Sequence, residues 1–173
     1  MMANYYTKTS FIFPLEKDQA EFAMGVLDCL DEDHLGDLQK RHKTKWAKSI
    51  DPEMLKCAKK LLRWLGEDFI EYGDLGFVVD IDEQRGLWIR SDETCVTENA
   101  AIFIRLILNY FDLDIGVCIN AAHTCSKLLL DAFGGHAAFV TKTGVSWMST
   151  DSFLHKQVSA HQKRLARKAE AQV

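Results

Sequence analysis

The segment 97–111, TENAAIFIRLILNYF, is apolar on nearly every side when it is drawn as a helix. Beyond its first turn, Arg105 and Asn109, four residues apart, form its one polar stripe. Thr97 is predicted to cap this helix, with Glu98 in the first turn, where an acidic side chain suits the helix dipole. A helix with so little polar surface has to be covered by other elements, so the segment predicts a helix buried across a sheet.

Two further helices are predicted in the N-terminal half. Residues 16–30 place apolar side chains at helical spacing between charges, which indicates an amphipathic helix. Asp51 and Pro52 form a strong start signal, because the carboxylate can accept from free amides and the proline has its φ preset for the first turn. Gly66 is predicted to end that helix in the left-handed conformation. The polar stretch 31–50 between them has no clear period and is interpreted as a loop or a marginal helix.

Short segments that are rich in aromatic and β-branched residues, or in which apolar and polar residues alternate, predict the strands. They are 10–13, a hairpin within 76–92, 114–122, and a second hairpin made by 136–142 and 145–149. Helices lie between and after these strands, which favours an α+β plan. We therefore expect a single domain over residues 1–173, with a mostly antiparallel sheet of five or six strands and helices packed on one face.

The composition indicates an ordinary globular protein of the cytoplasm. The chain has 173 residues, of which 47 % are hydrophobic and 27 % are charged. No apolar run of about 18 residues is present, so no membrane span is expected, and the first residues do not resemble a secretory signal. The five cysteines are scattered and form no C-x-x-C pair, so we expect them to be reduced and mostly buried as small hydrophobes.

The formal net charge of −4 is mild, but basic residues cluster at 40–48 and 163–168. Residues 155–173 are predicted to form a basic C-terminal helix that can protrude from the domain. The residues expected to contact a partner are Lys163, Arg164, Arg167, Lys168 and Trp88. Trp88 is included because, beside Val78, it would place an apolar spot on the outer face of the sheet.

The stretch 120–140 contains residue types that can carry out catalysis. A cysteine nucleophile needs a base within hydrogen-bond reach and a third group that orients the base, and Cys125, His136 and Asp131 are the right types. Their spacing matches no known nucleophile signature. The favoured interpretation is that these residues belong to two strands and the loop that joins them.

A zinc site is the second alternative for the same stretch. Its ligands would be Cys118, His123, Cys125 and His136. Structural zinc sites generally use tightly spaced pairs separated by a longer loop, and a histidine two residues before a cysteine is too short a pair for the usual knuckle. We therefore expect the cysteines to pack and the histidines to bond loop backbone groups, with no metal bound.

No cofactor is expected. Neither G-x-G-x-x-G nor G-x-x-x-x-G-K-[ST] occurs, which argues against dinucleotide and P-loop sites. Carboxylates do gather around the first hairpin, where they could hold Mg²⁺ or transfer protons. A solvated turn followed by acids in a first helical turn explains them more simply. These carboxylates are Asp80, Asp82, Glu83, Asp92, Glu93 and Glu98.

Four pieces of the sequence carry a resemblance to a known group of proteins. They are FIFPLEKDQAEFA, GLWIRSDE, ENAAIFIRLIL and TCSKLLLDAFGGHAAFVTKTGVSWMST, about half of the chain. Together they resemble small proteins of unknown function that bacteriophages and other mobile genetic elements carry. The resemblance implies a bacterial cytoplasm and a protein that acts by binding a host or phage macromolecule, including components of host defence.

We therefore expect a non-enzymatic binding protein with a protein partner, acting as an inhibitor of a host defence system. A Cys-dependent enzyme that uses Cys125 with His136 is the alternative, and a nucleic-acid-binding accessory protein that uses residues 40–48 and 163–168 is the second alternative. A homodimer stays open, and nucleic acid is not the favoured partner because the net charge is negative.

Overall fold

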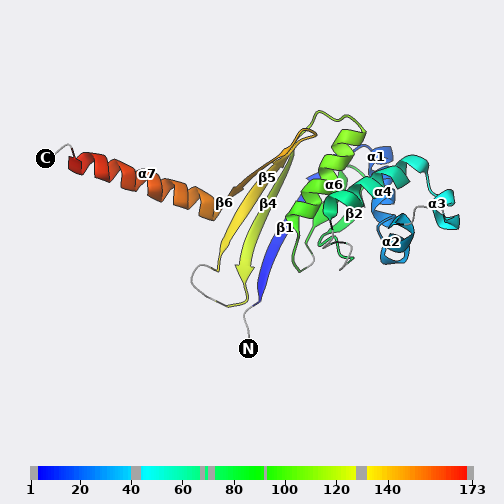
Figure 1. Ribbon diagram of the computed structural model, residues 1–173, viewed down its shortest axis with the longest axis horizontal. Coiled ribbons are helices and arrows are strands. Elements are labelled where there is room, and N and C mark those ends of the chain that lie inside the picture. Colours follow the sequence, from blue (N-terminus) through cyan, green and yellow to red (C-terminus); the bar gives the residue numbers. More distant parts are fainter. Residues whose placement is uncertain are drawn as a thin grey trace.

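The computed structural model describes residues 4–39, 44–66, 69, 73–91, 93–127 and 132–170. Its centre is one six-stranded antiparallel sheet in the order β2-β3-β1-β4-β5-β6, which confirms the predicted fold class (Figure 1). The strands are β1 (Tyr5–Phe13), β2 (Val78–Asp82), β3 (Gly86–Arg90), β4 (Val117–Cys125), β5 (Gly134–Val140) and β6 (Val145–Ser149).

Strand β1 is longer than the segment 10–13 predicted from its aromatic residues. It runs from Tyr5 to Phe13 and serves two neighbours in turn. Its first half pairs with β4, from Tyr5 opposite Cys125 to Thr9 opposite Ala121, and its second half pairs with β3. The polar first half is a strand because the ladder to β4 satisfies its backbone groups, which a local pattern cannot reveal.

The same pairing extends β4 to Cys125, three residues past the predicted end, and β5 begins at Gly134. His123, Cys125 and His136 therefore lie on strands. The expectation that the histidines bond loop backbone groups is wrong, because β1 continues the sheet to that level and leaves no loop there.

The helices are α1 (Lys17–Asp28), α2 (Glu32–Gln39), α3 (Lys45–Ser49), α4 (Pro52–Leu65), α6 (Thr97–Tyr110) and α7 (Thr150–Glu170). Helix α4 begins as predicted, since an Asp51 carboxylate oxygen accepts from the amides of Glu53 and Met54, and it ends at Gly66 with φ of 84°. Two short helices occupy most of the stretch 31–50. They are held together by His34, whose ring stacks on that of Trp46 with 4.2 Å between the centroids.

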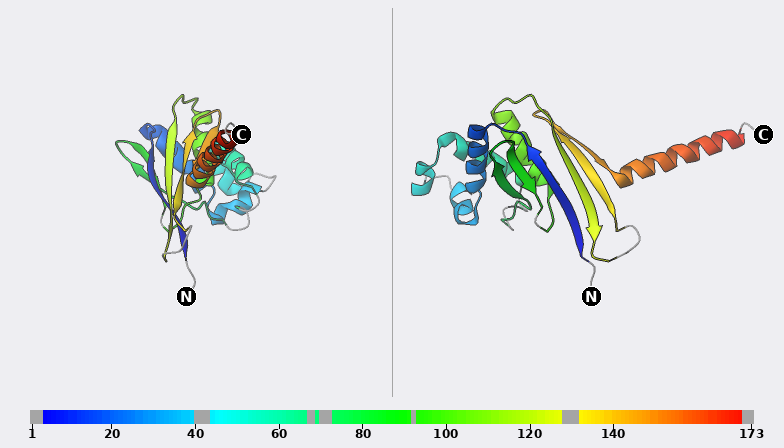
Figure 2. Two further views of the ribbon diagram at one scale, coloured as in Figure 1. Left: turned by 90° about the vertical axis from the view of Figure 1, so that its left-hand side faces the viewer. Right: turned by 180° about the vertical axis from the view of Figure 1, so that it is seen from behind.

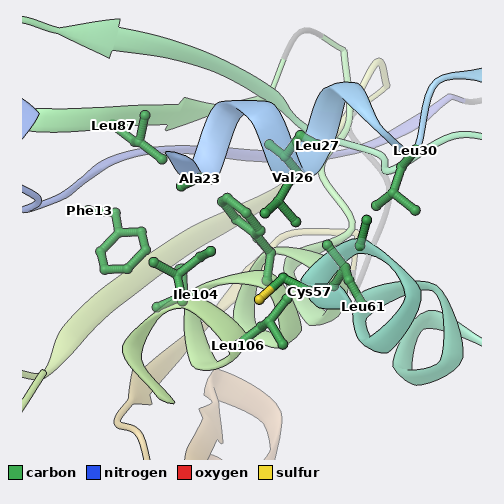
Figure 3. Packing of buried hydrophobic residues seen from close by; sticks show 14 of the residues in the cluster. Phe13, Ala23, Val26, Leu27, Leu30, Cys57, Leu61, Leu87, Ile104 and Leu106 are labelled. Atoms are coloured by element: carbon green, nitrogen blue, oxygen red, sulfur yellow. The ribbon is translucent and has the colours of Figure 1, made fainter. Parts of the chain in front are cut away.

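Helices α1 and α6 cover one face of the sheet, and α4 packs on both of them to enclose the core (Figures 1 and 3). Helix α6 lies at its centre, and Phe103 and Ile104 are fully buried, as the apolar sequence predicts. In Figure 3 the side chains of Phe13, Val26 and Leu61 converge with those of α6 from three other elements. Among the described residues, no helix combines the length and the apolarity needed to cross a membrane.

Helix α7 does not belong to that layer. It follows β6 directly and extends away from the domain on the side of the sheet opposite to the other helices (Figures 1 and 2). Its first turn meets β5 and β6. Side chains 151–158 and 160–167 are exposed. The predicted protruding helix therefore begins at Thr150, and the expectation that helices pack on one face holds for the rest of the domain.

Candidate functional site

The sheet divides the predicted site residues between its two faces. Along β4 the burial alternates, with Val117 and Ile119 turned toward the helices and Cys118 and Asn120 turned toward solvent. Cys118 therefore lies on the opposite face from His136, so the four residues of the predicted zinc quartet do not converge. Within the described part of the chain, no group of three or more His, Cys, Asp or Glu residues is placed to hold a metal ion.

Two histidines on the helix-covered face contact each other. His123 Nε2 lies 2.7 Å from His136 Nδ1, and His136 Nε2 lies 2.7 Å from Thr97 Oγ1 at the start of α6. The Thr97 hydroxyl donates in turn to a Glu98 carboxylate oxygen at 3.3 Å. Because the Thr97 hydroxyl uses its proton for Glu98, its oxygen accepts from His136 Nε2–H. His136 Nδ1 then carries no proton and accepts from His123 Nε2–H. The four groups form one hydrogen-bonded chain, which we call the His–His–Thr chain.

Thr97 was expected to cap α6, and the structure assigns it a different role. Val96 is the N-cap residue and makes no side-chain hydrogen bond, while Thr97 is the first helical residue. Its hydroxyl is directed to His136 because β5 passes beside the start of α6. The bond therefore ties the helix to the sheet.

Burial lowers the pKa of His136 below its ordinary value of 6.5, and the nearby His123 lowers it further, while Glu98 acts in the opposite direction. The lowered pKa keeps the His136 ring neutral near pH 7, as the hydrogen-bond directions require. A hydroxyl, an imidazole and a second group that orients the imidazole are also the parts of a nucleophilic triad. The Thr97 residue is only 1 % exposed, however, so a substrate cannot reach its hydroxyl.

Cys125 is far from the histidine that it was suggested to use. His136 stands opposite Ala121, four residues along β4 from Cys125, which corresponds to about 13 Å of strand. Both ring nitrogens of His136 are already occupied by His123 and Thr97. Asp131, the suggested orienting group, lies outside the described residues. The arrangement around Cys125 therefore offers no base for it among the groups that were proposed.

Three other cysteines behave as small core hydrophobes. Cys29, Cys57 and Cys95 are buried, and all five thiols are free. Burial raises the pKa of each of these three thiols, that of Cys95 to about 11. A thiol with a raised pKa is a poor nucleophile, so these positions are structural.

The solvent-facing side of the sheet contains a broad apolar groove of about 790 Å³ next to the start of α7. Small residues, among them Ala122, Gly135 and Ala137, form its floor, and the exposed side chains of Met148 and Phe153 border it. A Cβ atom at Gly135 would lie 2.6 Å from the carbonyl oxygen of Ala121, so no side chain fits at this point of the floor. His136 is among the residues that line the groove, but the sequence analysis did not predict the groove itself, although the alternation of small residues along 120–122 and 135–137 is visible in the sequence.

Trp88 lies on the same outer face, at the other end of the sheet. Its ring is 40 % exposed, and its Nε1–H donates to Ser10 Oγ at 2.8 Å. The Arg90 guanidinium covers the ring at 4.6 Å from the centroid and also pairs with Asp80 at 2.6 Å. Val78 shares this face, as expected. The apolar spot predicted around Trp88 is therefore partly covered by an ion pair.

The predicted basic residues lie on α7 and separate from its apolar residues. Leu154, Val158 and Leu165 are separated by four and then seven residues, spacings that place them on one stripe of the helix. Each of the three is more than half exposed. We call this stripe the apolar seam. The exposed side chains of Lys156, Lys163 and Arg167 lie on the opposite side of the helix, and we call them the basic face.

Of the other two predicted basic residues, Arg164 lies between these stripes and contacts His161 at 2.9 Å. For Lys168 the structure describes the backbone alone. Lys156 was not among the predicted contact residues, because it stands seven positions before the basic cluster and joins it only when the segment is helical.

Comparison of the chain with protein-family models, with curated proteins and with solved structures gives no match.

Proposed function

We propose that this chain is a non-enzymatic binding protein whose basic face on α7 binds an acidic surface of a protein partner. The observation that carries the proposal is a helix of 21 residues that projects from the domain and exposes the cationic side chains of Lys156, Lys163, Arg164 and Arg167. A projecting helix can enter a partner's groove or lie along a partner's surface without any change in the domain that carries it.

The geometry of the polar cluster supports a binding role over catalysis. The hydroxyl of the His–His–Thr chain is buried, and Cys125 lies about four strand positions from the level of His136. The surface that the large groove exposes is mostly apolar, although polar residues such as Lys8, Ser10 and Asn120 also line it. A binding surface needs exposed side chains on a rigid frame, and α7 with the sheet behind it has that form.

The charge distribution favours an acidic protein over nucleic acid. Helix α7 contains five Lys and Arg residues and two Asp and Glu residues, so the rest of the chain carries seven more acidic residues than basic ones. The acidic domain repels a long phosphate backbone, whereas a compact acidic patch on a protein can contact α7 alone. The basic face also lacks interleaved aromatic residues on which single-stranded bases would stack.

The resemblance to proteins of mobile elements extends the proposal to the partner's origin. We place the partner among the proteins of the bacterial host or of the mobile genetic element. Specifically, we propose a host defence protein, which binding would inhibit.

The test starts with the full chain immobilised in a bacterial lysate, and the retained protein is then purified. The affinity of that protein for the K163E/R167E variant is compared with its affinity for K45E/K48E, which makes the same charge change on exposed residues of α3. We expect at least about a tenfold loss of affinity for the α7 variant alone, because two favourable contacts become repulsive. The proposal fails if no protein is retained, if both variants lose affinity equally, or if the chain instead binds a labelled DNA duplex at low salt.

A further inference from the structure

Two surfaces of this chain are uncovered and lie next to each other. The apolar seam of α7 faces solvent, and so does the groove on the outer face of the sheet, which none of the described helices covers. In proteins, a helix gains most of its stability from the packing of its apolar side against other elements. The same holds for an apolar sheet face, which a second layer normally covers.

The junction between β6 and α7 prevents the helix from closing over its own sheet. Strand β6 ends at Ser149 and α7 begins at the next residue, so no connecting residue is available for a turn. Ser149 and Ser152 bond each other twice, from each amide to the other's hydroxyl at 3.1 Å. The Thr150 hydroxyl accepts from the amide of Gly135 on β5 at 3.1 Å and donates to the Gly135 carbonyl oxygen at 3.2 Å. These contacts hold α7 in its projecting direction.

We propose that the chain forms a two-fold symmetric dimer in which α7 of each copy lies across the outer sheet face of the other. The apolar seam of one copy then fills the groove of the second copy, over the floor of Ala122, Gly135 and Ala137. The contact is reciprocal, as a symmetric dimer requires, because each copy supplies one helix and one groove.

The dimensions of the two surfaces match. Helix α7 has 21 residues and is about 31 Å long, while six strands span about 24 Å across the sheet. The helix is therefore long enough to cross the whole face. The floor is made of small residues, which lets a helix with leucine and valine side chains approach closely.

The net charges of the helix and of the domain that receives it have opposite signs, which favours the approach of two copies at long range. The helix carries an excess of three basic residues, and the domain that receives it carries an excess of seven acidic residues. The basic face points away from the apolar seam, so it stays open in the dimer. The dimer is independent of the proposed function, and the two copies would present two basic faces to a partner.

The mass of the full chain in solution tests the dimer, measured by light scattering and by sedimentation over a range of protein concentrations. We expect a dimer, and we expect V158E and M148E each to raise its dissociation constant by about a hundredfold, because each places a carboxylate in the apolar contact. Both side chains are more than half exposed in the single chain, so neither change should unfold the domain. A160E places the same charge on the far side of α7 and should leave the dimer intact.

Each alternative gives a different pattern of results. A monomer at every concentration overturns the proposal, and so does a dimer that V158E leaves unchanged. A dimer that V158E breaks and M148E does not would be held by the two α7 helices alone, which also overturns it. As a direct check, a L165C/C118S copy mixed with a tagged native copy should form a bismaleimide cross-link to the native exposed Cys118, and replacement of Cys118 by serine in the native copy should abolish that cross-link.

Discussion

The two faces of the sheet differ in whether their apolar side chains are covered by other elements. On the inner face, α1 and α6 cover the strands with α4 packed on them, and even the polar His–His–Thr chain is closed off from solvent at Thr97. On the outer face, Phe139 and Met148 remain about half exposed and no described helix lies over them. The inner face therefore stabilises the domain, and the outer face is available for an interaction.

The largest expected difference between the two faces is the loss in free energy of unfolding when one aromatic ring is removed. F103A on α6 should lower the free energy of unfolding by about 3–5 kcal/mol, because Phe103 is fully buried and the change leaves a cavity. F139A, at a residue that is 48 % exposed, should cost less than about 1 kcal/mol in the monomer. Urea unfolding of both variants measures the difference, and equal costs would show that the outer face is covered within one chain.

A smaller effect is expected at the polar chain of the inner face. T97V removes the hydroxyl that accepts from His136 Nε2–H and leaves this partly buried donor unpaired, which should cost about 1 kcal/mol. T97S keeps the hydroxyl and should restore most of the loss in thermal unfolding. If T97V is as stable as the native chain, the hydrogen bond to His136 contributes nothing, and a loss in T97S alone would point to the methyl group, which T97V keeps.

The smallest effect is a dependence of stability on pH. Because the pKa of His136 is lowered in the folded state, the unfolded chain binds a proton more readily, and stability rises with pH across this range. The contribution of His136 is complete above pH 6.5, decreases as the pH falls below 6.5, and levels off below the folded-state pKa.

One such group changes the free energy of unfolding by at most about 1.4 kcal/mol per pH unit. Urea unfolding from pH 8 to pH 5 measures this slope. H136Q should remove the contribution, whereas H155Q, on the exposed surface of α7, should leave it in place. An unchanged slope in H136Q would assign the pH dependence to other groups.

Local signals predicted most of the elements well. The start of α4 at Asp51 and Pro52, its end at Gly66, and both hairpins appear where capping and turn residues place them. The stretch 31–50 was ambiguous because its two short helices depend on contacts such as His34 with Trp46. The first half of β1 was missed because pairing with β4, and no local pattern, makes it a strand.

The candidate site was predictable in its residue types but not in its contacts. His123 and His136 were recognised as neighbours in the sequence, whereas Thr97, 39 residues before His136, was assigned to a helix cap. Cys118 and His123 are both on β4, and only the alternation of that strand separates them onto different faces. A change of register by one residue would exchange those faces, so a site of this kind depends on pairing between distant segments.

The sequence alone determined that this chain builds an α+β domain around one buried apolar helix and that its last helix is basic, because periodicity, capping and charge are local properties of the chain. Only the tertiary structure decided that two histidines share a hydrogen bond, that Cys125 stands apart from them, and that the last helix leaves the domain beside an open groove. Those outcomes depend on strand register and on the direction in which a helix follows a strand, which are set by contacts between segments far apart in the sequence.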